Sequence, residues 1–258
     1  MVIFYPGVLP AGVLIDADFT PPPAPVVIAP KPLGPPAPIW FSTRDADSLE
    51  FTSASRVTGW AACAPSTARA RPVGFNKDGT GWDAASQSLD FVEKTHGGLC
   101  VADAISDGSC FSLGLIYTPP PKRDAQTLLS LQAREDEGYA FLSAESGFIR
   151  FGLKGGEASL HLPDPQRLTL LLLSSDGQRV RMSANRDLAI SVACALPAAP
   201  LDLFLGCRGG SRSLLGKLGS FQASDLLIWP DQDVLAGEVA RAPEAALSLW
   251  QERLRNGN

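Results

Sequence analysis

The residues best suited to chemistry gather in one glycine-rich segment, FNKDGTGWD, which runs from Phe75 to Asp83. It places the ring of Trp82 near several side chains that form hydrogen bonds. Sugar sites use this combination, because an aromatic face covers the apolar side of a pyranose ring while polar groups bind its hydroxyls. The segment therefore predicts a carbohydrate site, with these polar candidates: Asn76, Asp78 and Asp83.

The same polar residues admit a second interpretation, as ligands of calcium. Asn76, Asp78 and Asp83 carry the oxygen atoms that Ca²⁺ prefers, but their spacing is not that of an EF-hand. Zinc is not expected, because the two histidines, His96 and His161, have no partner at ligand spacing. We expect no metal and no cofactor, and calcium stays an alternative.

Further candidates lie elsewhere in the chain. Trp60 is a second candidate platform for a sugar ring, and for both Trp60 and Trp82 ordinary core packing is the alternative. Arg208 and Arg212 lie in the glycine-rich turn Gly206–Ser213, where they would contact acidic saccharides; a solvated turn is the alternative for them.

Known catalytic motifs do not match the chain. It contains no G-x-S-x-G. The segment Gly210–Leu218 has one residue too many for a phosphate loop and a leucine where Ser or Thr would bind magnesium. The acidic cluster Glu135–Glu137 lies in a turn signal, where solvation is the default. We therefore expect a protein that is not an enzyme.

Composition favours many short strands over a helical bundle. The 258 residues include 24 glycines and 22 prolines, and 45% are hydrophobic, which is enough for a large core. The net charge of −5, with no basic cluster, argues against nucleic acid as a partner.

The termini and cysteines bear on the compartment. The first residues lack a basic region, and prolines and glycines interrupt their apolar run, so neither a signal peptide nor a membrane span is predicted. The five cysteines form no CxxC pair and are odd in number. They favour reduced core thiols in a protein made in the cytoplasm, with a bridge between Cys100 and Cys110 as the alternative.

The first 38 residues differ from the rest, because they contain eleven of the 22 prolines. The run from Pro21 to Pro38 favours polyproline II and predicts a semi-rigid spacer. The apolar segment Met1–Thr20 precedes it and is suited to docking, with these candidate anchor residues: Phe4, Tyr5, Val8 and Leu9. A segment that wraps the folded body as an extra strand is the alternative.

From Ile39 onward the pattern indicates strands. Phe111, Leu113 and Leu115 alternate with small residues, and Arg167–Ser174 is a continuous apolar run, typical of a strand buried on both faces. Asp176-Gly177 predicts a hairpin turn. Further strands are expected at Thr127–Gln132, Tyr139–Ser143, Gly147–Leu153, Val180–Ala184 and Leu188–Val192.

The segment Ala242–Arg255 predicts one helix. Pro243 and Glu244 suit its first turn, and the apolar residues fall on one stripe. We expect the helix to pack on an edge of the folded body, with an oligomer contact as the alternative.

The stretch Leu201–Leu235 (LDLFLGCRGGSRSLLGKLGSFQASDLLIWPDQDVL) resembles the closing strands of concanavalin A-like, laminin-G-type jelly rolls. The resemblance implies an antiparallel β-sandwich over residues 39–235, between an N-terminal arm (1–38) and a helical tail (236–258). That family mostly binds polysaccharide or protein ligands, and some branches cleave glycans. The E-x-D-x-x-E-like spacing of its retaining glycanases is absent here.

An apolar anchor, a stiff spacer and a lectin-like domain together resemble a spike or fibre of a gene transfer agent or related tailed-phage particle. We expect a carbohydrate-binding component that adheres to cell-surface polysaccharide and contacts other particle proteins through its arm. Several copies would act together, reaching the outside by lysis. A polysaccharide depolymerase and a purely structural particle protein are the alternatives.

Overall fold

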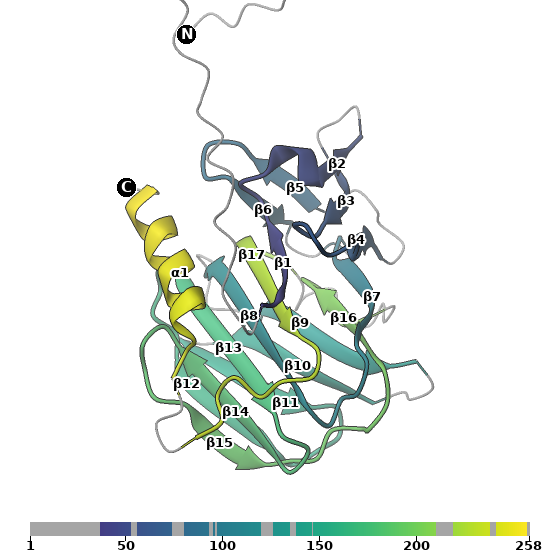
Figure 1. Ribbon diagram of the computed structural model, residues 1–258, viewed down its shortest axis with the longest axis vertical. Coiled ribbons are helices and arrows are strands. Elements are labelled where there is room, and N and C mark those ends of the chain that lie inside the picture. Colours follow the sequence, from purple (N-terminus) through teal and green to yellow (C-terminus); the bar gives the residue numbers. More distant parts are fainter. Residues whose placement is uncertain are drawn as a thin grey trace, which may run out of the picture.

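The computed structural model describes residues 37–52, 56–73, 80–92, 95, 97–119, 126–134, 138–145, 147–209, 219–237 and 241–256. Within these residues the chain forms two antiparallel sheets packed face to face, with one α-helix, α1 (Glu244–Asn256), near the C-terminus (Figure 1). This arrangement confirms the expected β-sandwich. The predicted anchor residues Phe4, Tyr5, Val8 and Leu9 lie outside the described part of the chain.

The first sheet has eight strands in the described residues. Its order is β15-β14-β13-β8-β17-β6-β5, and β1 pairs with β17 beside this path. The strands are β1 (Ile39–Ser42), β5 (Thr80–Asp83), β6 (Ser88–Phe91), β8 (Phe111–Thr118), β13 (Thr169–Ser175), β14 (Arg179–Ala184), β15 (Ile190–Ala193) and β17 (Phe221–Trp229).

The second sheet has nine strands in the described residues, in the order β12-β11-β10-β9-β16-β7-β4-β3-β2. A short 3₁₀ helix, η1 (Ala46–Ser48), leads into it. The strands are β2 (Leu49–Phe51), β3 (Val57–Ala61), β4 (Arg69–Pro72), β7 (Leu99–Ile105), β9 (Gln126–Ala133), β10 (Tyr139–Glu145), β11 (Phe148–Leu153), β12 (Ser159–Pro163) and β16 (Leu201–Leu205).

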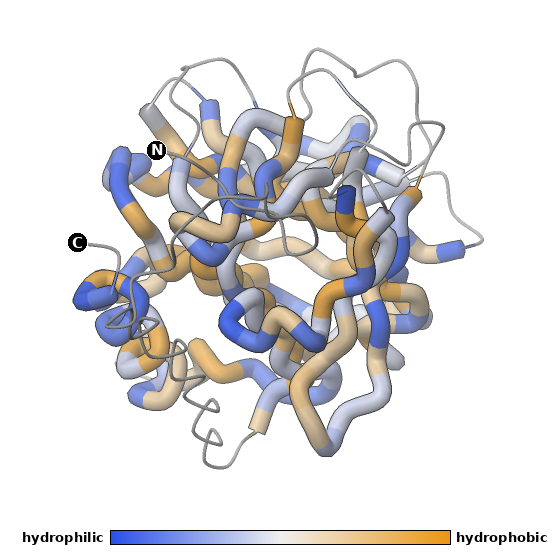
Figure 2. The backbone as a smooth tube through the Cα atoms, turned by 90° about the horizontal axis from the view of Figure 1, so that it is seen from above, coloured by the Kyte–Doolittle hydropathy of each residue, from blue (hydrophilic) through white to orange (hydrophobic). Residues whose placement is uncertain are grey.

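Strand alternation builds the core between the sheets. Phe111, Leu113 and Leu115 on β8 point inward and are at most 1% exposed, as predicted. The Asp176-Gly177 turn also forms where predicted, with Gly177 at a φ of +82°. Along the tube in Figure 2, hydrophobic and hydrophilic stretches follow one another repeatedly, and many of the outer turns are hydrophilic.

A second apolar layer covers the outside of the eight-stranded sheet. Leu170 and Leu172 on β13 point outward and pack with Trp250 of α1, while Leu171 and Leu173 point inward. The prediction of a strand buried on both faces is confirmed. The expected edge position of the helix is wrong, because α1 lies on the outer face of the central strands (Figure 1).

The cysteines form no disulfide in the structure. All five cysteines are free thiols, and burial raises the pKa of Cys100 and Cys207 to about 12, so these two stay protonated at neutral pH. Among the described residues, no helix has the length and apolar character that crossing a membrane requires.

Candidate carbohydrate-binding cleft

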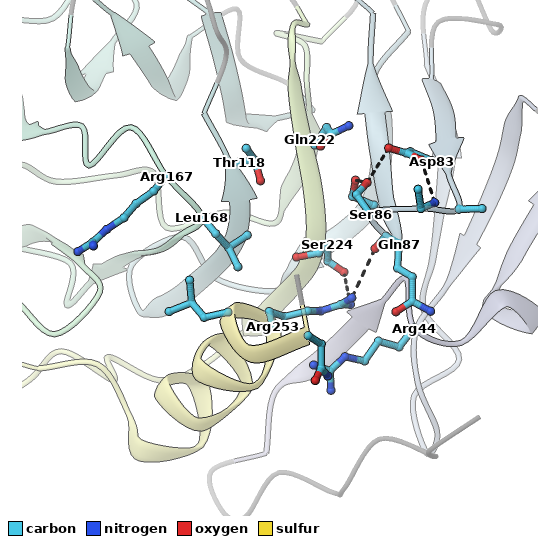
Figure 3. A pocket seen from close by; sticks show the side chains of 15 residues that line it. Arg44, Asp83, Ser86, Gln87, Thr118, Arg167, Leu168, Gln222, Ser224 and Arg253 are labelled. Carbon is cyan, nitrogen blue, oxygen red and sulfur yellow. Dashed lines mark hydrogen bonds between the residues drawn. The ribbon is translucent and has the colours of Figure 1, made fainter. Parts of the chain in front are cut away.

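A cleft of about 930 Å³ lies on the outer face of the eight-stranded sheet, where α1 ends (Figure 3). Its floor comes from β8 and β17, one wall from the turn between β5 and β6, and the other from α1 and the segment before β13. The lining residues are Arg44, Asp83, Ala84, Ala85, Ser86, Gln87, Ser88, Thr118, Arg167, Leu168, Gln222, Ser224, Arg253, Leu254 and Asn256.

Neutral hydrogen-bonding groups form the floor. Gln222 lies between two core residues of β17, so strand alternation directs its side chain outward. Thr118 is its cross-strand partner on β8. Ser224 follows at the bulge, where the register of β17 shifts. These groups both donate and accept hydrogen bonds without bringing charge into the cleft.

The turn between β5 and β6 is held by Asp83. Its carboxylate accepts hydrogen bonds from the Ala85 N–H and the Ser86 hydroxyl, each at 2.9 Å. The hydrogen bond from Ser86, followed by that from Ala85, lowers the pKa of Asp83. Both carboxylate oxygens therefore serve the turn, which presents Ser86 and Gln87 to the cleft (Figure 3).

Arg253 fixes the end of α1 at the base of the cleft. Its Nε donates to the Asp225 carboxylate at 2.7 Å, and the two side chains are 6% and 0% exposed. Its terminal nitrogens donate to the carbonyls of Gln87 and Ser224 and to the hydroxyls of Ser42 and Thr43. These partners occupy the guanidinium of Arg253. It therefore holds the residues around the cleft in place and is not available to a ligand.

The remaining charges nearly balance. Arg44 forms an ion pair with Glu252 at 2.6 Å. Arg167 is exposed, and no carboxylate of the described residues lies within ion-pair distance of it. Asp83 supplies one negative charge. A preformed, nearly neutral cleft with many hydrogen-bonding side chains suits a hydroxyl-rich ligand such as a saccharide.

Two of the predicted residues lie on one strand but on opposite faces of it. Asp83 lines the cleft, whereas Trp82 points the other way, against the core and the ring of Phe51, whose centroid is 5.6 Å away. The structure therefore does not bring this ring together with that carboxylate. Asn76 and Asp78, the other candidates of the segment, lie outside the described residues.

Trp60 does not fit its predicted role. It is 0% exposed, packs 5.4 Å from Phe41 between ring centroids, and donates its Nε1–H to the Ser42 carbonyl. A ring without an exposed face cannot stack on a sugar, so ordinary core packing, the alternative interpretation, is what the structure has.

Arg208 lies far from the cleft, on the outer face of the nine-stranded sheet. The alternative interpretation, a solvated turn residue, does not describe it. Arg208 is only 8% exposed, and its guanidinium stacks on the Phe141 ring at 3.8 Å from the centroid. Arg212 lies outside the described residues.

Most of the residues that line the cleft were not predicted from the sequence. The signal that was available is the placement of Gln222 between two core residues in a predicted strand. Gln87 and Arg167 gave no local signal, because only the packing of α1 places them across the same cleft. Arg253 lies in the last turn of α1, where a cation is favourable in any helix, and its partner Asp225 lies on another element.

Comparisons with known proteins place the fold. No protein-family model matches the chain, and no curated protein matches it. A sialidase of Trypanosoma rangeli in complex with sialic acid is similar, with a TM-score of 0.55 and 13% identity. That alignment covers 85% of this chain and 33% of the sialidase, so the chain spans about a third of the enzyme's length.

Two further solved structures match less of the chain. The CBM40 domain of the Ruminococcus gnavus IT-sialidase, bound to alpha2,3 sialyllactose, has a TM-score of 0.38 at 13% identity, covering 50% of this chain and 79% of that one. A galectin of Caenorhabditis elegans has a TM-score of 0.35 at 13% identity, covering 51% and 88%. At these TM-scores neither likeness establishes a shared fold. The match to the Trypanosoma rangeli sialidase shows a shared fold alone: this chain is an antiparallel β-sandwich.

Proposed function

We propose that this protein binds carbohydrate and does not cleave it, with the cleft at the end of α1 as the binding site. The observation that carries the proposal is the cleft itself: about 930 Å³, preformed, nearly neutral and floored by hydroxyl and amide side chains. Such groups match sugar hydroxyls, and a preformed site avoids the entropy cost of ordering side chains. The Trypanosoma rangeli enzyme was solved with sialic acid, and we carry over a saccharide as the ligand class.

The finer proposal concerns where the protein acts. The proline-rich run from Pro21 to Pro38 would hold the sandwich away from an anchored Met1–Thr20 segment, as in a spike or fibre of a phage-like particle. Its ligand would be cell-surface polysaccharide, and other particle proteins would hold the arm. Several copies on one particle would convert weak single sites into firm attachment.

The test measures binding of the full-length protein, displayed on multivalent beads, to cells with and without their capsular polysaccharide. We expect capsule-dependent binding that falls at least tenfold in Gln222→Ala and Arg167→Ala. The matched controls are Gln178→Ala and Arg179→Ala, which remove the same side-chain types from an exposed turn and strand end outside the cleft. Capsule-independent binding, or equal losses in variants and controls, would overturn the proposal in favour of a purely structural role.

A second candidate function, hydrolysis of the bound glycan, is favoured by one observation. Asp83 and Asp90 are diagonal neighbours on β5 and β6, and their pKa values are shifted in opposite directions. Burial, and then the Asp83 carboxylate, raises the pKa of Asp90 while that of Asp83 is lowered. Glycosidases need one protonated and one ionised carboxyl group.

The two functions separate in one assay. Reducing ends released from purified capsule by the wild-type protein, and abolished by Asp90→Asn, would establish hydrolysis. We expect no release, because the oxygens of Asp83 are occupied by its own turn.

A further inference from the structure

A second polar surface lies on the outer face of the nine-stranded sheet. On β10 the inward residues Ala140, Leu142 and Ala144 belong to the core, so the residues between them point outward. Together with residues of β11 and of the turn after β16 they form a surface that we call the arginine face. Its members are Tyr139, Phe141, Ser143, Arg150 and Arg208.

Phe141 is the centre of the arginine face. Its ring lies against Gly152, its partner on β11, where a Cβ atom would be only 2.8 Å from the ring. Arg208 stacks on this ring at 3.8 Å and donates its Nε–H to the Thr127 hydroxyl at 2.7 Å. Ring and hydroxyl thus hold the guanidinium in one place.

Arg208 is a buried cation without a carboxylate partner among the described residues. It is 8% exposed, and no carboxylate of the described residues lies within ion-pair distance of its guanidinium. Folding removes such a group from water at a free-energy cost that a carboxylate partner usually offsets. Here the partners are a neutral hydroxyl and two rings, so within the described part of the chain no carboxylate balances the positive charge.

Two further groups beside it lack partners. Ser143 is 1% exposed, and its buried Oγ has no hydrogen-bond partner. Its cross-strand neighbour Arg150 has a buried Nε without a partner, and only a loose contact of 3.9 Å to Glu145. The Arg150 guanidinium lies 5.7 Å from the Phe141 ring centroid. Unsatisfied donors in one place indicate an absent acceptor.

We propose that the arginine face binds a saccharide bearing an anionic group, a carboxylate or a sulfate, through Arg208 and Arg150. A guanidinium matches either anion with paired hydrogen bonds. Ser143 adds a neutral donor. Tyr139 lies 6.1 Å from Phe141 between ring centroids and adds a second, half-buried aromatic ring beside the guanidinium of Arg208, against which a sugar ring would pack.

This site is independent of the cleft, because the two lie on opposite outer faces of the sandwich. It also differs in chemistry, since the buried guanidinium of the arginine face has no carboxylate partner among the described residues, whereas the buried guanidinium of the cleft, Arg253, is paired with Asp225. With a net charge of −5, the protein as a whole repels polyanions, so binding of one would have to come from a local site.

The experiment is calorimetric titration of the full-length protein with defined oligosaccharides. The probes are hexagalacturonate for the carboxylate, its methyl ester as the neutral match, and sulfated maltohexaose with plain maltohexaose for the sulfate. We expect one anionic probe to bind and its neutral match to bind at least tenfold more weakly. Binding of neither anionic probe, or equal binding of each matched pair, overturns the proposal.

Variants locate the site. Arg208→Gln and Arg150→Gln should each weaken anion binding at least tenfold, while Arg186→Gln, an exposed arginine in the turn after β14, and Gln222→Ala in the cleft should not. Arg208→Lys retains the charge without the paired donors and tests the site if Arg208→Gln fails to fold. Equal losses in Arg186→Gln would reduce the binding to general charge attraction and refute the site.

Discussion

The two outer faces of the sandwich use buried arginine in opposite ways. In the cleft, Arg253 donates to Asp225 and to four neutral oxygens, so its charge is neutralised within the fold. On the arginine face, Arg208 is nearly as buried, yet among the described residues its guanidinium contacts a hydroxyl and the rings of Phe141 and Tyr139 and no carboxylate. Burial alone therefore does not decide the role of an arginine: we propose a binding role for Arg208 because, among the described residues, it lacks the carboxylate partner that Arg253 has.

The contrast between the two arginines is tested most directly by replacing Arg253. Arg253→Met leaves the Asp225 carboxylate, which is 0% exposed, without its cation. We expect a loss of about 3–5 kcal/mol in the free energy of unfolding, measured by urea denaturation. Arg44→Met is the control: its partner Glu252 is 40% exposed, so the loss should stay below about 1 kcal/mol.

A double variant sharpens this result. Replacing both members of the pair, in Arg253→Met with Asp225→Leu, removes the stranded charge and should recover part of the stability. If the single variant at Arg253 costs no more than the one at Arg44, the arginine is not structural and the contrast with Arg208 fails.

Trp60→Ala should cost nearly as much stability without touching either site. The side chain is 0% exposed, and truncating it leaves a cavity, for which we expect about 3–5 kcal/mol in urea denaturation. Trp82→Ala should cost less, because Trp82 is only half-buried. Below the unfolding transition, Trp60→Ala should still bind capsule. A selective loss of binding in the folded variant would restore Trp60 as a sugar platform.

Local patterns predicted most of the strands after residue 108, but neither the individual strands β1–β7 nor the surfaces that the tertiary structure creates. Inner and outer residues of β8 followed from alternation alone, because that partition is a property of neighbouring residues. The continuous apolar run of β13 also required a cover on its outer face. The apolar stripe of α1 is that cover, so the helix lies on the outer face of the sheet and not at its edge.

The candidate residues failed or succeeded for a related reason. Trp60 follows Gly59, which suggests a loop, but it lies on β3 and packing between the two sheets buries it. Arg208 follows a glycine turn, and nothing near it in sequence predicts the ring of Phe141 beneath it. Tyr139 and Phe141 do alternate with core residues in the sequence, and this alternation predicts an aromatic outer face.

Gly152→Ala probes the arginine face without removing any of its polar groups. The new Cβ would lie 2.8 Å from the tip of the Phe141 ring and displace the surface on which Arg208 stacks. Because that ring is only half-buried, we expect a stability loss of about 1 kcal/mol, at the low end for overpacking. Anion binding should fall several-fold in calorimetry, and capsule binding at the cleft should not change. Unchanged anion binding would mean that the stack does not position Arg208.

The smallest expected effect separates the two faces by pH. The pKa of Asp83 is lowered in the folded protein by its hydrogen bonds from Ser86 and Ala85, so the ionised form stabilises the turn. That contribution is complete above the unfolded pKa of about 3.9 and is lost as pH falls through the lower folded value. Binding at the cleft should therefore weaken modestly below about pH 4. Guanidinium and sulfate both stay charged there, so binding of a sulfated saccharide at the arginine face should not. Asp83→Asn, which cannot titrate, should remove the part of this pH dependence that Asp83 causes, leaving that of its neighbour Asp90. If wild-type cleft binding shows the same pH dependence as this variant, the turn that Asp83 holds does not shape the site.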